Sequence, residues 1–478
     1  MRKGYITVFL SLSLTLILSL VFTVIEGARI SAIRMKFECV ADIGMNSVLA
    51  EYNRELLSQY DLLFVDTSYG SGNPSIANAE EHLRNYMQKN LIGQKGSGFG
   101  QGRDFLNMRV DSVEITACSI ASDEDGRVLK RQITDYMADY PVGYLIEKIT
   151  GNITQLEGSG MESRDTAGER AGYEAQIAAI GLPKQEVEEG VFEEVPLDNP
   201  ADIANSTRSI GVLNLVVEDI GSISTVKVPL MQYISNRTLM QGSGMCAEAA
   251  QISGEPNDIL FLAYLFQKCG YYGQEKENSL LRYQIEYMIA GKDTDWLNLE
   301  YVAKKLLRWR EAANVLYILS DGSKVAEAEA MALALTAVML SPALAEPVKY
   351  TILYAWAYVE SLQDVKTLLQ GGKVPILKTA ADWKTGIDSI KNVKQSLSNT
   401  GDGGNGLSYK EYLEIMLFLT NDHDRTFRAM DIMEMDIRKT PGNSGFRLDG
   451  CFDTYRARLS VMSSFGYHYE MERLYGFY

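Results

Sequence analysis

The sequence predicts a mostly helical α+β fold with three parts: a long N-terminal helix, a small β-sheet domain built from both chain ends, and an inserted helical domain. An uncharged apolar run occupies residues 5–25, strand-like alternation is confined to the two ends, and the middle has apolar residues at helical spacing. With 478 residues, of which 46% are hydrophobic and 23% charged, the chain is long enough for two or three domains with substantial cores.

The first element is the apolar run YITVFLSLSLTLILSLVFTVI at 5–25, which follows a leader of residues 1–4. A helix of this length spans about 32 Å, which matches the hydrocarbon core of a bilayer. The residues after it, Glu26 to Arg29, contain no small-x-small cleavage site, so the run predicts a retained transmembrane helix rather than a signal peptide. We therefore expect a single-pass protein of the cell membrane, with the lipid bilayer as its first partner.

Basic residues flank the run on both sides. Arg2 and Lys3 precede it, while Arg29, Arg34 and Lys36 follow it closely. Counting Lys and Arg near the span therefore leaves its orientation open. We expect the leader to be cytoplasmic and the bulk of the chain extracytoplasmic, partly on the resemblance described below.

Small residues recur at every fourth position of the run and just beyond it. They form what we call the small-residue ridge: Thr7, Ser11, Thr15, Ser19, Thr23, Gly27 and Ser31. Such ridges let two membrane helices approach closely and cross. Alternatively, these hydroxyl side chains are merely tolerated in lipid, because each can bond to a carbonyl one turn back. The pattern leaves both interpretations open.

The helical pattern continues beyond the run. From Ile33 to Leu56 apolar residues recur at spacings of three and four, with charged residues between them. We expect one helix from about residue 5 to 59, about 80 Å long. Its second half should pack on a membrane-proximal α+β domain within residues 26–150.

A short strand is predicted at 61–66, and alternation of apolar and polar residues predicts further strands at 105–120 and 451–461, so the predicted strands lie near both ends of the chain. Because these patterns cluster at the two ends while the middle is helical, we expect residues 441–478 to return to the N-terminal sheet.

Two segments of different composition lie between the ends. Residues 151–208 are acidic and contain Pro183, Pro196 and Pro200, which predicts a linker or an excursion between domains. Residues 209–440 predict a helical domain, because they show helical spacing with breaks at Gly or Pro. Its main helices are expected at 258–269, 279–290, 297–319, 324–340 and 347–369.

One apolar run inside the helical domain, residues 330–345, has two interpretations. It is either a buried helix of a soluble bundle or a second membrane span. The run is short, rich in alanine and flanked by Glu327, Glu329 and Glu346, which favours the buried helix.

Composition argues against several classes of function. A formal charge of −16 offers no basic face for phosphates, so nucleic acid is not an expected partner. The five cysteines form no CxxC pair, the three histidines are isolated from paired His or Cys ligands in the sequence, and no GxSxG, HExxH or Walker motif occurs. We therefore expect no catalytic, cofactor-binding or metal site, and a protein that is not an enzyme.

The N-terminal residues carry a family resemblance. A short basic leader ending in Gly4, the apolar run, and the following AEYNRELLSQYDLLFVD resemble TadE/TadG-like pseudopilin proteins of tight-adherence (Flp-type) pilus loci. The resemblance to an uncharacterised bacterial membrane-anchored family related to them extends to YQIEYMIAGKDTDWLNLE and LLRWREAANVLYILSD. It implies leader cleavage after Gly4. The glutamate usual at the fifth mature position is replaced here by Phe9.

Two functional hypotheses follow. The first is a non-enzymatic, pseudopilin-like component of a tight-adherence-type pilus or a related surface or secretion assembly. Its N-terminal helix would contact other membrane or pilus-assembly proteins and would also allow an oligomer. The second is a membrane-tethered receptor or sensor for a small ligand or glycan, in which the span serves only as a tether.

Overall fold

The computed structural model describes residues 3–92, 106–138, 143–188, 191–244, 255–398 and 404–477. The chain forms two compact units. The sheet unit comprises Met1–Ala138, Met231–Ile252 and Met433–Tyr478, and the helical unit comprises Asp139–Leu230 and Ser253–Ile432. The predicted α+β fold, with a sheet shared by both chain ends and helical structure inserted between them, is confirmed.

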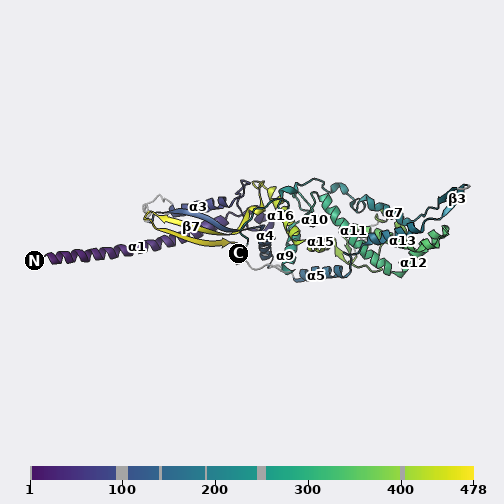
Figure 1. Ribbon diagram of the computed structural model, residues 1–478, viewed down its shortest axis with the longest axis horizontal. Coiled ribbons are helices and arrows are strands. Elements are labelled where there is room, and N and C mark those ends of the chain that lie inside the picture. The colour runs from purple at the N-terminus through teal and green to yellow at the C-terminus, as the bar shows by residue number, and fades with distance from the viewer. Residues whose placement is uncertain are drawn as a thin grey trace. The chain divides into compact units, whose positions relative to one another are not determined.

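Helix α1 (Lys3–Leu49) has two halves with different surroundings. The large apolar side chains from Tyr5 to Ile25 are exposed, whereas Ile33, Phe37 and Val48 are buried. In Figure 1 the N-terminal half projects from the sheet unit, and the second half runs beside α3 and β7. The sequence pattern explains the change, because the helix is apolar all round in its first half and apolar on one stripe in its second.

The expectation of one helix through residue 59 is wrong. Helix α1 ends at Leu49, and a separate helix, α2, spans Arg54–Tyr60. Asn53 begins the second helix by accepting a hydrogen bond from the Leu56 N–H, and Tyr52 forms a β-bridge with Val65. The bridge and the cap together redirect the chain toward the sheet, although the apolar spacing continues across the break.

The sheet is antiparallel and is centred on the C-terminal strand β7 (Cys451–Ser463). Strand β7 pairs with β2 (Met108–Ile120), β8 (His468–Gly476) and the short β1 (Val65–Asp66). Leu459 lies opposite Val113 on one side and Met471 on the other, and all three are buried. These apolar side chains belong to one core with α1 and α3 (Ile76–Ile92), which makes the sheet unit a sheet covered by helices.

Buried ion pairs attach the remaining parts of the sheet unit. Arg131, on α4 (Asp123–Met137), pairs with Asp453 of β7. Arg237 contacts both Glu434 and Asp449, each at 2.5 Å. These pairs bring the segment around residue 237 to the C-terminal part of the unit.

Helix α13 (Ala345–Leu369) is the centre of the helical unit. Every residue from Thr351 to Leu369 is buried, and helices α6, α7, α11 and α12 pack against it. The helices of this unit are α5 (Gly143–Gly158), α6 (Thr166–Ile180), α7 (Pro200–Ser206), α8 (Leu213–Val216), α9 (Glu255–Lys268), α10 (Gln284–Ala290), α11 (Asp295–Ser320), α12 (Gly322–Val338), α13, α14 (Val393–Ser396), α15 (Tyr409–Phe418) and the first part of α16 (Asp422–Arg438). Among the described residues this unit also has two small two-stranded sheets, β3 (Lys184–Glu188) with β4 (Val191–Glu194) and β5 (Lys373–Val374) with β6 (Leu407–Ser408).

The acidic segment 151–208 is not a linker, which corrects the prediction from its composition. It contains the second half of α5, all of α6 and α7, and the β3–β4 hairpin. Tyr173 of α6 stacks on Tyr350 of α13 with ring centroids 4.5 Å apart, and Arg208 pairs with Glu311 of α11 at 2.5 Å. Aromatic contacts and ion pairs to the central helices therefore order a segment whose charge suggested disorder.

The run 330–345 does not form one continuous helix. Helix α12 ends at Val338, and a 3-10 turn, Pro342–Leu344, separates it from α13. Ala328, Ala332 and Thr336 are buried against the unit, whereas Leu333 is exposed. The run is thus half of a packed helix followed by a turn. In the described part of the chain, α1 is the single helix long and apolar enough to cross a membrane.

The two halves of α1 should respond differently to the same substitution. Phe37→Ala removes a fully buried ring from the core of the sheet unit and should destabilise that unit by about 3–5 kcal/mol. Phe9→Ala changes a ring that is 70% exposed and should leave the unit unchanged. Amide hydrogen exchange of β7 in detergent-solubilised protein measures both effects, and equal protection in the two variants would contradict the packing described here.

Candidate functional site

The first of two candidate sites is the small-residue ridge. It lies along the exposed N-terminal half of α1, which we call the bare half. All seven predicted residues are in this helix and are exposed. Apart from the neighbouring backbone of the helix itself, no described atom lies within 4 Å of where a Cβ would stand at Gly4 or Gly27. The ridge is therefore open to lipid or to another helix along its whole length.

The hydroxyl groups of the ridge bond within their own helix. Thr15 Oγ1 donates to the Ser11 carbonyl at 2.8 Å, Thr23 Oγ1 to the Ser19 carbonyl at 2.8 Å, and Ser31 Oγ to the Gly27 carbonyl at 3.0 Å. Ser11 and Ser19 donate to the carbonyls three residues back. This is the bonding that makes Ser and Thr tolerable in lipid, and it leaves the small, smooth surface of the ridge intact.

The ridge turns slowly around the helix. A step of four residues advances about 40° beyond a full turn, so the ridge rotates by roughly 240° between Thr7 and Ser31. Thr15 lies eighteen residues, or five turns, before Ile33 and so faces the same side as that buried residue. Ser31 is nearly opposite Ile33. Different parts of one ridge thus face different directions.

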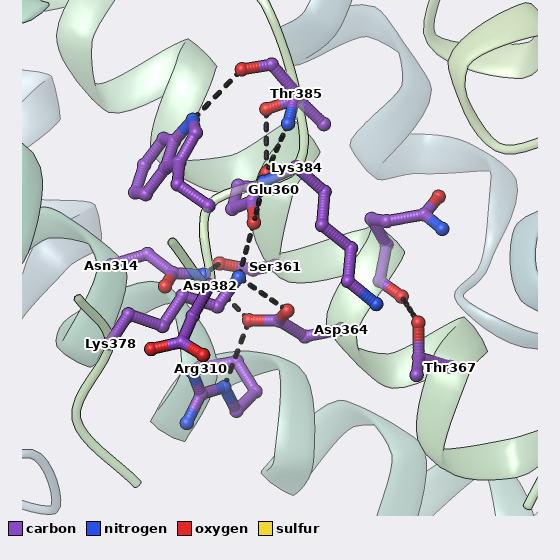
Figure 2. Close-up of polar contacts among 12 residues, drawn as sticks. Arg310, Asn314, Glu360, Ser361, Asp364, Thr367, Lys378, Asp382, Lys384 and Thr385 are labelled. Carbon is purple, nitrogen blue, oxygen red and sulfur yellow. Dashed lines mark hydrogen bonds and ion pairs between the residues drawn. The ribbon is translucent and has the colours of Figure 1, made fainter. Parts of the chain in front are cut away.

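The second candidate site is a buried ion cluster in the helical unit (Figure 2). Arg310 and Asn314 come from one face of α11, and Glu360 and Asp364 come from one face of α13, because both pairs are four residues apart. Lys378 comes from the segment after β5. All four charged side chains are at most 1% exposed.

Asp364 occupies the centre of the cluster. Its Oδ2 accepts hydrogen bonds from Arg310 Nε at 3.0 Å and from Asn314 Nδ2 at 2.9 Å, and its Oδ1 lies 2.6 Å from Lys378 Nζ. Lys378 also pairs with Glu360. Burial alone would raise the pKa of the Asp364 carboxyl, but the charges of Lys378 and Arg310 outweigh burial and hold the pKa below its ordinary value.

The cluster fastens an irregular segment to the two helices. Arg310 Nη1 donates to the carbonyls of Pro375 and Ile376 at 2.7 and 2.9 Å. Glu360 accepts from the backbone N–H groups of Lys384 and Thr385 at 3.0 and 2.9 Å. The two positive and two negative side chains neutralise one another, and Arg310 and Glu360 also form hydrogen bonds with the backbone of the irregular segment. The arrangement is that of a structural clamp.

A separate buried acid lies at Glu286 of α10. Its Oε1 accepts from the Tyr272 N–H at 2.9 Å and from the Tyr409 hydroxyl at 2.8 Å. Within the described part of the chain, its Oε2 has no hydrogen-bond partner. Burial raises the pKa of this carboxyl to about 7, although the two hydrogen bonds oppose the shift.

Sequence reasoning located the ridge but missed both buried sites. The available signal was polar pairs at a spacing of four inside otherwise apolar helices, Arg310 with Asn314 and Glu360 with Asp364. Within the residues described, no group of three or more His, Cys, Asp or Glu side chains is placed to hold a metal ion. Cys118, Cys269 and Cys451 are buried, and Cys39 is exposed.

Comparison with known proteins gives one match. A sequence model described as "Family of unknown function (DUF5702)" matches residues 190–463, more than half of the chain. The chain belongs to this family. The matched range contains both helices of the ion cluster and strand β7, but not α1. No curated protein and no solved structure matches the chain.

Lys378→Met should destabilise the helical unit by about 3–5 kcal/mol, because it leaves the carboxylates of Glu360 and Asp364 buried without their shared cation. Arg282→Met is a matched control, since Arg282 forms a 3.7 Å ion pair with Glu275 in which both side chains are about half exposed. The control should cost less than about 1 kcal/mol. Urea unfolding followed by tryptophan fluorescence reports on this unit, because Trp296, Trp309, Trp356 and Trp383 all belong to it. Similar losses in both variants would contradict the clamp.

Glu286 predicts a specific pH dependence. Because its folded-state pKa of about 7 exceeds the ordinary 4.5, the native state holds a proton that the unfolded state releases between these values. The free energy of unfolding should therefore fall by roughly 3 kcal/mol as pH rises through this window. Glu286→Gln should remove this decline, whereas Glu275→Gln, at an exposed position, should retain it. Unfolding curves at pH 5 and pH 8 measure the difference, and an unchanged slope in Glu286→Gln would refute it.

Proposed function

We propose that the protein is a non-enzymatic, membrane-anchored, pseudopilin-like component of a tight-adherence-type pilus or a related surface assembly. The observation that carries the proposal is the bare half of α1. It is long and apolar enough to span a bilayer, none of it is buried within the chain, and it bears the small-residue ridge. The resemblance of the N-terminal residues to TadE/TadG-like proteins supports the pilus context.

The continuity of α1 favours an anchor that is mechanically coupled to the sheet unit over one that serves only as a tether. The helix runs without a break from Lys3 to Leu49, and residues in its second half form the core of the sheet unit. Movement of the span would therefore be transmitted to the sheet unit through one rigid helix. A receptor that needs only a tether has no use for such a connection.

Rotation of the ridge favours assembly with more than one neighbour. A partner helix near Thr15 would lie on the side of Ile33, and one near Ser31 would lie on the opposite side. One α1 could thus contact two neighbouring helices in different directions, as a repeating assembly requires.

The proposed topology is a single pass with a cytoplasmic N-terminus and both units outside the cell. Gly4 lies in the first turn of α1 and is exposed, so it would be accessible to a leader peptidase before the helix enters an assembly. Phe9 at the position of the usual glutamate implies that packing of the ridge, rather than a buried carboxylate, would set the register between subunits.

Replacing Ser11, Thr15 and Ser19 together with Leu should keep the span hydrophobic and block close approach of a partner helix. We expect co-purification of neighbouring pilus-locus membrane proteins, and formation of the surface assembly, to fall at least several-fold at matched membrane levels.

Leu substitutions at Ser13, Ile17 and Val21 provide the control. Each control position follows a ridge residue by two residues, which places it about 200° around the helix and at nearly the same depth in the bilayer. The control substitutions therefore change the opposite face of the helix. Assembly should survive in this variant. If the ridge variant assembles normally as well, the ridge is not a packing surface, and the span would be the simple tether of a receptor or sensor.

A further inference from the structure

The turn between β7 and β8 lies beside the point where α1 would leave the membrane. Arg29 of α1 donates to Ser463 Oγ at 3.4 Å, and its guanidinium lies over the Phe465 ring at 3.3 Å from the centroid. Five residues further along, Arg34 Nε donates to the Tyr467 hydroxyl at 2.8 Å. These contacts all lie within the sheet unit and fix the turn against the helix.

The side-chain direction of Arg29 places this contact near the membrane side. Side chains of a helix lean toward its N-terminus, which for α1 is the end that would lie in lipid. The ion pair of Arg29 with Glu26, at 3.4 Å, has this orientation. The Phe465 ring, stacked on the guanidinium, is consequently carried toward the bilayer.

A depth estimate agrees with this placement. If residues 5–25 fill the hydrocarbon core, Arg29 begins about 6 Å beyond it, within a headgroup layer that is about 5–7 Å thick on each side. Phe465 is 65% exposed although it is a large apolar ring, and Tyr467 is half-buried beside it. Tyr is enriched at membrane interfaces, and segments that lie in the interface bury Phe at the headgroup boundary with Arg or Lys on their polar face.

We propose that the β7–β8 turn is a second membrane contact, in which Phe465 inserts into the headgroup layer of the same bilayer that α1 spans. This inference rests on the proposed anchor. The turn would then stop the sheet unit from rotating about or tilting on α1, because the unit would touch the bilayer at two points. The occupant of this surface is lipid rather than protein, since the surface continues directly from the span.

Photocrosslinking of the full-length protein in phosphatidylcholine–phosphatidylglycerol vesicles tests the proposal. Benzoylphenylalanine is introduced singly at Leu14, Phe465 or Arg54. Leu14 lies in the middle of the span and is the positive control. Arg54 is the negative control, because it is exposed in α2 and follows a stretch of α1, from Arg29 to Leu49, that is about 30 Å long. The replacement at Phe465 keeps an aromatic ring at an exposed position, so folding should be retained.

Lipid adducts, identified by mass spectrometry, should form at Leu14 and Phe465 in comparable yield and should exceed those at Arg54 several-fold. Adducts at Leu14 without adducts at Phe465 would overturn the second contact and leave the anchor standing. A yield at Leu14 no higher than at Arg54 would overturn the anchor and the second contact together.

Discussion

The change of side-chain pattern along helix α1 is the constraint on which the architecture of the sheet unit depends. A helix satisfies its backbone hydrogen bonds internally whether lipid or protein surrounds it, so one continuous helix suits both a membrane span and a packed segment. Only the side-chain pattern changes, from apolar on every side before Ile25 to a buried stripe that includes Ile33, Phe37 and Val48. The sheet then needs to cover that stripe alone, and strands β7 and β8 with helix α3 do so.

The coarse fold followed from the sequence because its strongest signals are periodic. The uncharged run, the alternation at both chain ends and the helical spacing in the middle each depend on local geometry, and each is present in the structure. The break after Leu49 could not be read in this way, since the apolar spacing passes through it. What ends the helix is the cap at Asn53 together with a β-bridge from Tyr52 to Val65, a partner thirteen residues away.

Composition was a poorer guide than periodicity. The acidic segment 151–208 was expected to be a linker or excursion because net charge was weighed without knowledge of the contacts that the segment makes with the central helices. Tyr173 stacks on Tyr350 of α13, and Arg208 pairs with Glu311 of α11, so the segment is packed despite its charge. The ion cluster was missed for a related reason. Its members are separated by up to 68 residues, from Arg310 to Lys378, and no local pattern records which charges meet.

The position of β7 at the end of the chain makes the folding of one unit depend on the other. Val113 pairs with Leu459, and closing a flexible loop of more than 300 residues costs roughly 5 kcal/mol in chain entropy. A folded helical unit replaces most of that flexible loop with fixed structure and so lowers this cost. The buried cluster of Arg310, Asp364, Lys378 and Glu360 therefore acts beyond its own unit. By fixing the segment after β5 to α11 and α13, it helps to preserve the folded insertion across which the two ends of the chain form one sheet.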